Sequence, residues 1–253
     1  MKTIRVSLIL ALAITFVGFS SCGNSSDPAN ENSVKDTVAT DTSNWGFSPI
    51  MQQFVDSISQ NLEDIDSARK LELNTLAAYI TESLKADSIV KLTYICTHNS
   101  RRSHMAQLWS AVAAHYYGIK SVETYSGGTE ATAFNPRSVA CLKKQGFDIT
   151  PLNEEKNTQY SVVFSPAVPA VKAFSKIYND PSNPQNGFIA VMTCSHADEA
   201  CPVVNGASKR VAIPYIDPKI SDDTDLESQT YYQRSAQIAT EAFYAFKRVK
   251  GGI

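Results

Sequence analysis

One stretch near the middle of the chain constrains the fold more than any other. A strand-like run, Leu92–Ile95, leads into Cys96, and a helix-like run begins at Ser103 and continues to about Tyr117. Between the two runs, five residues separate Cys96 from Arg102. Five residues let the backbone curl so that successive N–H groups point inward, and the helix N-terminus adds partial positive charge on the same side. The pattern therefore predicts a site for a tetrahedral anion.

The cysteine and the arginine have separate tasks in such a site. Arg102 presents a planar fork of donors to two oxygens of the anion. The same positive surroundings favour the thiolate form of Cys96, which makes it a nucleophile at neutral pH. The alternative is a structural cysteine at the end of a buried strand. It does not explain why strand, cysteine, loop, arginine and helix follow one another in this order.

The bulk composition excludes some classes of protein. The chain has 253 residues and a formal net charge of −2, which favours neither a nucleic-acid partner nor an acidic disordered tail. Its five cysteines are too few for a disulfide scaffold, so each is interpreted separately.

The N-terminus resembles a bacterial lipoprotein signal. Two basic residues precede an apolar run, Val6–Phe19, that is too short to span a bilayer comfortably, and small residues then lead to Cys22. We expect residues 1–22 to be the signal, with Cys22 lipidated and the protein anchored to a membrane of the bacterial cell envelope, facing the periplasm or the exterior. Ordinary signal cleavage, which leaves a soluble secreted protein, is the alternative. Residues 23–46 are rich in Asn, Ser, Asp and Thr and predict a flexible tether.

Residues 47–90 predict an N-terminal helical extension. Apolar residues recur at helical spacing in two runs, from Phe54 to Ile65 and from Leu73 to Leu84. We interpret these helices as a packing element that covers one face of the following domain. A hairpin for dimerisation or for docking a partner is the alternative.

From residue 91 onward, strand patterns alternate with helix patterns. The alternation predicts an α/β fold, a small four-stranded parallel sheet with helices on both faces. Ligands of such folds bind at the C-terminal ends of the strands. Cys96, Cys194 and Asp217 each lie at or just past such an end, so the topology is expected to bring them together. The strands are predicted at 91–96, 121–126, 188–193 and 210–215, and the helices at 103–117, 135–145 and 225–249.

These motifs resemble the low-molecular-weight protein tyrosine phosphatase superfamily, and more closely its thioredoxin-coupled arsenate reductases. The resemblance implies the same parallel fold and runs from about residue 91 to 249, within a catalytic domain expected at 91–253. A stretch at about 155–187 is expected to be an insertion. The residues that carry the resemblance are Ile95–Gln107, Tyr125–Thr129, Asn135–Val139, Met192–Cys194, Cys201-Pro202 and Asp217-Pro218.

The resemblance implies a role for each residue of the site. Cys96 is expected to be the nucleophile, Arg102 to bind the oxyanion, and Asp217 to act as a general acid. Ser103 is expected to donate a hydrogen bond to the thiolate, and Asn99 to hold the loop in shape with Ser126 as its supporting partner. The residues expected to form the oxyanion loop are Thr97, His98, Asn99, Ser100, Arg101 and Ser103.

The chain departs from the family pattern at four positions, His98, Arg101, Gln107 and Lys219, of which the first two lie in the loop. His98 stands where the family usually has Gly, but His tolerates a positive φ better than most residues, so the loop is still expected to form. Arg101 stands where the reductases commonly have Cys, which adds a cation at the mouth of the site.

Cys194 and Cys201 separate two mechanisms that the resemblance allows. In a reductase, Cys194 attacks Cys96 after arsenate has added to it, and Cys201 then attacks Cys194, which requires an external thioredoxin-like thiol reductant. The polar segment between these two cysteines is expected to be a mobile loop. In a phosphatase, water hydrolyses a Cys96 cysteinyl-phosphate, and the later cysteines are structural, as in a static disulfide.

The first expectation is therefore an arsenate reductase of the cell envelope, with an envelope thioredoxin-like partner. The alternatives are a low-molecular-weight phosphatase acting on phosphotyrosine or a small phosphate ester, and a membrane-tethered oxyanion-binding lipoprotein that does not turn over. No bound cofactor and no nucleic-acid partner are expected. No metal site is expected either, because the cysteines lack a further set of zinc ligands.

Overall fold

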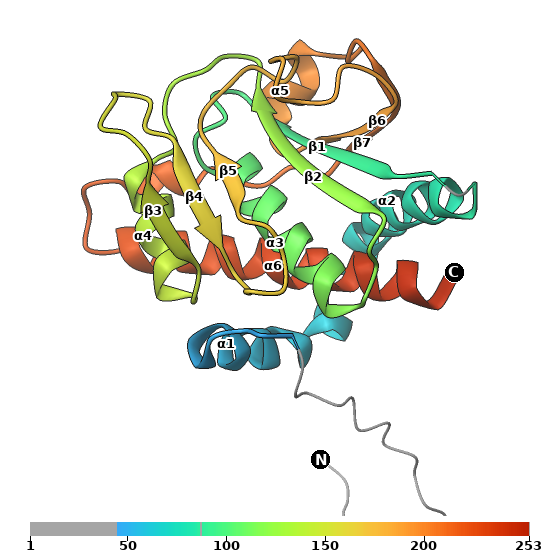
Figure 1. Ribbon diagram of the computed structural model, residues 1–253, viewed down its shortest axis with the longest axis horizontal. Helices are drawn as coiled ribbons and strands as arrows, with labels where there is room; N and C mark the ends of the chain where they lie inside the picture. The colour runs from blue at the N-terminus through green and yellow to red at the C-terminus, as the bar shows by residue number, and fades with distance from the viewer. Residues whose placement is uncertain (1–44, 87, 253) are drawn as a thin grey trace, which may run out of the picture. The chain divides into compact units, whose positions relative to one another are not determined.

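The computed structural model describes residues 45–86 and 88–252 (Figure 1). Their main feature is a parallel sheet in the strand order β2-β1-β6-β7. The predicted signal with Cys22, and residues 23–44 of the predicted tether, lie outside the described residues. Among the helices of the described residues, none combines the length and the hydropathy of a membrane span. The strands of the sheet are β1 (Val90–Cys96), β2 (Val122–Gly128), β6 (Phe188–Met192) and β7 (Ala207–Ala212).

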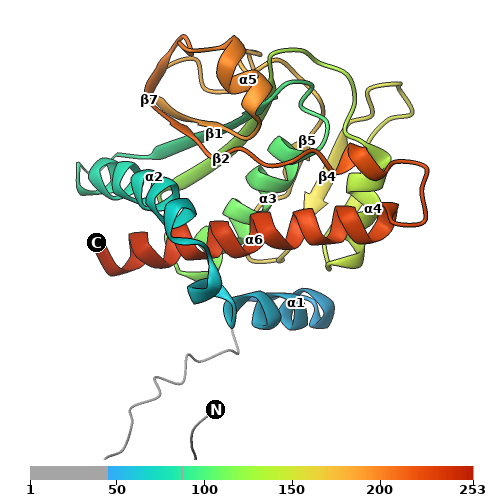
Figure 2. The ribbon, with the colours of Figure 1, turned by 180° about the vertical axis from the view of Figure 1, so that it is seen from behind.

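Helices flank this sheet on both faces, which confirms the predicted fold class (Figures 1 and 2). One face carries α2 (Ser67–Lys85), α3 (Arg102–Tyr116) and α6 (Glu227–Gly252), and the other carries α5 (Ser195–Ala200) with the loops around it. Successive side chains of a strand point to opposite faces, so a strand between two layers is apolar throughout. In β6, Ile189 and Val191 join the core of the long helices, whereas the alternate residues join a smaller core that includes Ala197 of α5.

The helices before residue 86 share the main core. α1 (Pro49–Ser59), the short η1 (Leu62–Asp64) and α2 bury apolar residues in the cluster that also contains the inner faces of α3 and α6. This burial confirms the interpretation of the extension as a packing element. Trp45, which precedes α1, stacks on Tyr116 with the ring centroids 4.1 Å apart.

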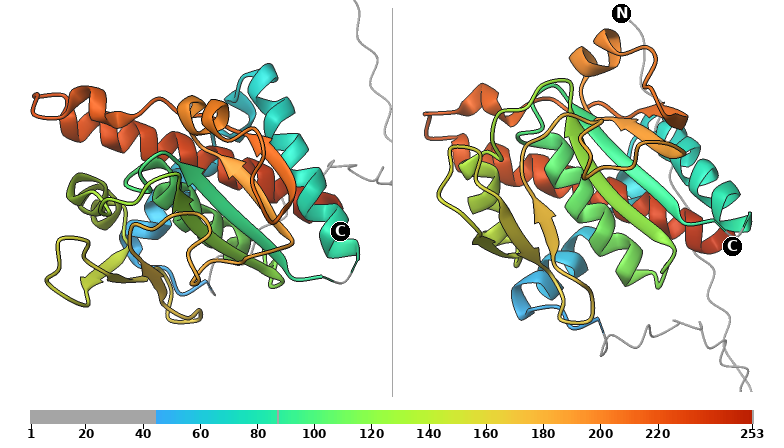
Figure 3. Two further views of the ribbon diagram at one scale, coloured as in Figure 1. Left: turned by 90° about the horizontal axis from the view of Figure 1, so that it is seen from above. Right: turned by 45° about the horizontal axis from the view of Figure 1, so that its top comes forward.

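The predicted insertion at about 155–187 forms most of a second sheet. β3 (Asp148–Pro151), β4 (Tyr160–Val163) and β5 (Val171–Ala173) pair in antiparallel fashion, and Figure 3 shows this sheet, in yellow, to one side of the parallel sheet. The chain then passes the C-terminal end of β2, where the N–H of Gly128 donates to the carbonyl of Lys176 at 2.8 Å. The insertion therefore reaches the edge of the sheet at which the site is predicted.

Strands β7 and β2 differ most from the sequence prediction. β7 begins at Ala207 rather than at residue 210, and it ends at Ala212 rather than at residue 215, because Pro214 has no N–H to donate to the ladder. β2 continues through Gly127 and Gly128, although the glycine pair indicates a turn, and Gly128 pairs with Cys96 in register. The end of β2 and the end of β1 thus lie side by side.

Helix α4 (Pro136–Lys144) begins with a side-chain cap. The Asn135 side chain accepts a hydrogen bond from the N–H of Arg137 at 2.9 Å, and Pro136 occupies the first turn. Helix α6 begins at Glu227, two residues after the predicted start at 225. The Glu227 carboxylate accepts from the N–H of Asp223 at 2.8 Å.

Candidate active site

Cys96 ends β1 in a buried polar setting. Its side chain is only 3% exposed, and its Sγ lies 3.1 Å from the Oγ of Ser103 in the first turn of α3. The Nδ2 of Asn99 donates to the same Ser103 oxygen at 2.8 Å. Because that oxygen already accepts a hydrogen bond from Asn99, its own hydroxyl proton is available to the sulfur. The arrangement is the one predicted for Ser103.

The loop between Cys96 and Arg102 turns its carbonyl groups outward. Four of them accept hydrogen bonds of 2.8 to 3.1 Å from residues outside the loop. Within the described residues, no acceptor is found for the N–H groups of residues 97–101. The loop thus has donors to offer to an anion, as predicted. The four bonds run from Thr129 N to Cys96 O, Glu130 N to Thr97 O, Ser175 Oγ to His98 O, and Asn135 N to Ser100 O.

Arg102 lies between the loop and the segment that follows β7. One terminal nitrogen donates to the carbonyl of Tyr215 at 2.9 Å, and the other donates to Asp217 Oδ2 at 2.6 Å. Its Nε is buried and has no partner among the described residues. A buried N–H without an acceptor is unfavourable, so this nitrogen is suited to an incoming anion.

Asp217 has two partners at once. Besides the contact with Arg102, its Oδ1 accepts from the N–H of Lys219 at 3.1 Å and so caps η2 (Pro218–Ser221). The carboxylate is therefore both a turn residue and a group that faces the site. Asp217 thus lies beside Arg102, at the end of the loop that begins at Cys96, in agreement with the convergence of strand ends that was predicted for Cys96, Cys194 and Asp217.

Arg101 does not add a free cation to the mouth of the site. Its Nε donates to the hydroxyl of Tyr231 at 2.7 Å, and a terminal nitrogen donates to Asp222 Oδ2 at 3.2 Å. Its Nε also lies 3.9 Å from Asp217 Oδ1. Asp222 neutralises the added charge, and Arg101 links the loop to the segment that carries Asp217.

The strained position of the loop is Asn99 rather than His98. Asn99 has a φ of +43°, a conformation that Asn tolerates because its short polar side chain bonds locally. Its Oδ1 accepts from the N–H of Lys176 at 2.9 Å. His98 instead lies exposed, with its Nε2 3.5 Å from the Glu130 carboxylate. The expectation that a positive φ falls on His98 is wrong, whereas the expectation that Asn99 shapes the loop agrees with its contacts.

Ser126 has a different partner from the one predicted. Its Oγ lies 3.2 Å from the Nδ1 of His104, which is fully buried and stacks on Phe134 with the ring centroids 4.0 Å apart. Burial lowers the pKa of His104 well below its ordinary value, and the nearby Lys176 charge adds to the effect. A neutral imidazole therefore packs behind the loop with Ser126, since Asn99 is already occupied by Ser103 and Lys176.

Cys194 lies against the same loop. It caps the N-terminus of α5, is 1% exposed, and has its Sγ 3.5 Å from the Oγ1 of Thr97. Cys201 directly follows α5 and is partly exposed. Both are free thiols, so the static disulfide of the alternative interpretation is absent from the described structure. The segment between them is a helix, which corrects the prediction of a mobile loop.

Comparisons with known proteins agree with this geometry. A family model described as low molecular weight phosphotyrosine protein phosphatase matches residues 91–163. The arsenate reductase of Bacillus subtilis strain 168 is 30% identical over 141 residues, which is 56% of this chain and 83% of the relative. That of Halalkalibacterium halodurans is 28% identical with the same coverage.

The chain belongs to the low-molecular-weight protein tyrosine phosphatase superfamily. It lies close to the arsenate reductases of this superfamily, and it is a cysteine-dependent enzyme of one of these two types, a reductase or a phosphatase. Among solved structures, it is similar to a low molecular weight phosphotyrosine phosphatase from Vibrio cholerae O395. The TM-score is 0.41 at 12% identity, with 61% of this chain and 93% of that chain covered.

This superfamily member also uses residues that sequence reasoning missed. Ser175 and Lys176 hold the loop from the insertion, 77 residues away in sequence from His98 and Asn99 respectively. Lys176 is 5% exposed, and burial lowers its pKa to about 8. The contacts with the loop are made by the hydroxyl of Ser175 and the backbone N–H of Lys176, for which the sequence carries no motif.

Proposed function

We propose that this enzyme is a thiol-dependent arsenate reductase that uses Cys96, Cys194 and Cys201 in turn. The observation that carries the proposal is the position of Cys194, whose sulfur lies against Thr97 in the loop of the nucleophile. A phosphatase has no use for a second thiol at this place. The relatives that bear the name arsenate reductase add support.

The first step is the addition of Cys96 to arsenate. The thiolate attacks arsenic(V) and forms a sulfur–arsenic bond while one arsenic–oxygen bond breaks. The leaving oxygen departs as water after Asp217 donates a proton to it. The N–H groups of the loop and Arg102 stabilise the negative charge on the remaining oxygens.

The second step transfers two electrons. The Cys194 thiolate attacks the sulfur of Cys96, a disulfide forms, and the sulfur–arsenic bond breaks with its electron pair remaining on arsenic. Arsenic is thereby reduced from the V to the III state and leaves as arsenite. The Cys201 thiolate then attacks Cys194, which releases Cys96 as a thiolate and leaves a Cys194–Cys201 disulfide for an external dithiol to reduce.

Formation of that last disulfide requires a change in α5. Cys194 and Cys201 flank a six-residue helix, and a rise of about 1.5 Å per residue places their Cα atoms about 10 Å apart. A disulfide requires a Cα separation below about 7 Å. The helix must therefore unwind during turnover, and so short a helix has little stability of its own.

A low-molecular-weight phosphatase is the second candidate. The observation that favours it is Asp217, whose carboxylate lies 2.6 Å from Arg102 and is thus placed to protonate an ester oxygen. In that reaction water releases phosphate from Cys96, and neither Cys194 nor Cys201 takes part.

One experiment separates the two candidates. The purified full-length protein is given arsenate with a thioredoxin-type reductant system and, separately, p-nitrophenyl phosphate. We expect Cys194→Ser to abolish arsenite production and to leave any ester hydrolysis unchanged, because only the reductase uses the second thiol. Cys141→Ala is the matched control, since Cys141 is a buried thiol on α4. If Cys194→Ser and Cys201→Ser both leave arsenite production intact, the reductase assignment is wrong.

We also propose that the enzyme works in the cell envelope, anchored through Cys22. The support is the signal-like sequence that ends at Cys22. Its reductant is then a thioredoxin-like protein of that compartment.

A further inference from the structure

We propose that Arg69, on helix α2 of the N-terminal extension, is a positioning residue for the segment that carries Asp217. The proposal rests on the proposed function in one respect, because it takes Asp217 to be the general acid. Arg69 lies outside the residues matched by the family model, which begin at 91. It is a group through which the extension acts on the site.

Arg69 binds the segment after β7 on the side of the sheet that carries the long helices. A terminal nitrogen donates to the carbonyl of Pro214 at 3.0 Å, and the guanidinium carbon lies 4.7 Å from the centroid of the Tyr215 ring. Its Nε donates to Glu241 Oε2 of α6 at 2.9 Å, and both side chains are largely buried. Its other terminal nitrogen donates to Glu72 on the same helix. A planar fork that serves these acceptors and stacks on a ring fixes Pro214, Tyr215 and Glu241 relative to one another.

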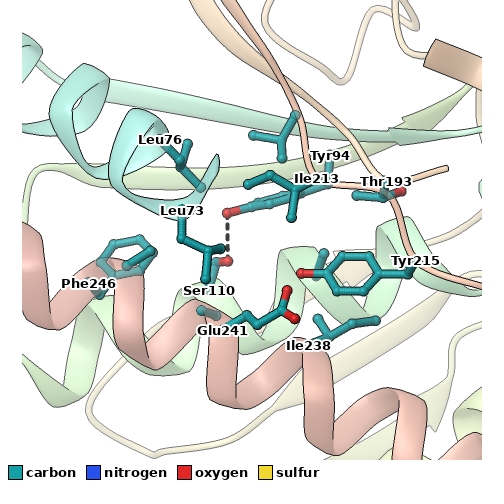
Figure 4. Close-up of a pocket in the computed structure, with 14 residues that line it drawn as sticks. Leu73, Leu76, Tyr94, Ser110, Thr193, Ile213, Tyr215, Ile238, Glu241 and Phe246 are labelled. Carbon is teal, nitrogen blue, oxygen red and sulfur yellow. Dashed lines mark hydrogen bonds between the residues drawn. The ribbon is translucent and has the colours of Figure 1, made fainter. Parts of the chain in front are cut away.

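Glu241, which accepts from Arg69, also faces Tyr215. Figure 4 shows the Tyr215 ring between β1 and α6, with its hydroxyl pointing toward the Glu241 carboxylate. Tyr215 is 8% exposed, and burial with the adjacent Glu241 charge raises its pKa well above the ordinary value, so it remains a neutral phenol. Its ring thus lies against Arg69 on one face, with its hydroxyl directed at the Glu241 carboxylate.

The residue after Pro214, Tyr215, contacts the site through its carbonyl. Arg69 binds the carbonyl of Pro214, and Arg102 binds that of Tyr215 and the carboxylate of Asp217. β7 ends at Ala212, and beyond it the N–H groups of Ile213 and Tyr215 still bond to the carbonyls of Met192 and Thr193. Arg69 binds the carbonyl of Pro214 between these two bonds, and so holds in place the residues that lead to Asp217.

The test removes the contacts of the Arg69 guanidinium without leaving the buried Glu241 charge unpaired. In Arg69→Met/Glu241→Gln, the apolar side chain fills the space and the Gln retains an oxygen for the Nε2 of Gln237. We expect kcat for arsenite production to fall about tenfold, since misplaced catalytic groups cost activity on that scale. In an Asp217→Asn background, we expect the same pair to cost less than about twofold, because its effect passes through Asp217. Lys70→Met, on the same helix with its Nζ donating to Glu63 O, should leave kcat unchanged.

Hydrogen exchange provides a readout that does not require turnover. The N–H of Tyr215 donates to the carbonyl of Thr193 at 3.1 Å, and we expect it to exchange at least about tenfold faster in the double variant. Equal losses of kcat in the two backgrounds, or unchanged exchange at Tyr215, would overturn the proposal. If the wild-type enzyme makes no arsenite, the proposed function fails, and the exchange of Tyr215 still decides whether Arg69 holds the segment.

Discussion

Gly128 lies so close to the loop after Cys96 that one added carbon would displace the loop backbone. In Gly128→Ala, the new Cβ would lie 2.3 Å from the carbonyl oxygen of Glu130, 2.6 Å from that of Thr97 and 2.7 Å from the nitrogen of Asn99. Ordinary contacts of a Cβ begin at 3.4 Å, so these atoms must move by about 1 Å. All three are backbone atoms, and no side chain can rotate away.

The cost of this movement has two parts. The N–H groups of Thr129 and Glu130 bond to the carbonyls of Cys96 and Thr97, so a shift of the loop breaks or stretches these bonds. Overpacking of a tight site typically costs about 1 to 3 kcal/mol, and rigid neighbours on three sides place this site near the upper value. A misplacement of about 1 Å in the reacting groups lowers the rate by about a hundredfold.

The assay combines urea unfolding with arsenite production at saturating arsenate. Gly118→Ala is the control, because its Cβ would meet nothing within 4 Å and its φ of +67° carries backbone strain alone. We expect the control to lose about 1 kcal/mol of stability and to keep its kcat. If Gly128→Ala turns over within twofold of the wild type, the loop is not fixed against β2 and the reasoning fails.

Two further predictions concern other parts of the chain. The pKa of Lys176 is about 8 in the folded protein against 10.5 for the free side chain, so between these values the unfolded chain holds a proton that the folded one has released. Raising the pH from 7 to 10.5 should therefore stabilise the wild type by up to about 3 kcal/mol more than Lys176→Met in urea unfolding, and a pH-independent difference would contradict this. For the proposed anchor, a radioactive fatty acid should label the full-length protein and not Cys22→Ser, and a labelled variant would disprove lipidation at Cys22.

The sequence predicts the part of the site that depends on strand ends. Cys96, Cys194 and Asp217 could be placed together because parallel strands finish at one edge of a sheet. The spacing from Cys96 to Arg102 predicts that the N–H groups of the loop point inward, because the path of five consecutive residues is a local property of the chain. Contacts such as Cys96 with Ser103 follow from that local geometry.

The remainder depends on contacts between distant segments. The backbone conformation of Asn99 is held by a bond from Lys176, and the sequence around neither residue indicates this contact. Ser126 contacts His104 and not Asn99, because Lys176 in the insertion already bonds to the side chain of Asn99. The end of β7 could not be located to the residue, because Ile213 and Tyr215 still bond to neighbouring carbonyls after the regular pairing stops.

The loop of this enzyme is therefore supported from outside the segment that the family model matches. Ser175 and Lys176 fix its carbonyl and its strained Asn99 from the insertion, and Arg69 fixes the segment of Asp217 from the extension. These supports act on carbonyls and on the Asn99 side chain rather than on the N–H groups of the loop, so their effect does not depend on which anion occupies the site. A chain reduced to the matched residues 91–163 would keep Cys96 and Arg102. It would lose the groups that hold these two residues in place. The unfavourable backbone conformation of Asn99 would then no longer be offset by its bond with Lys176.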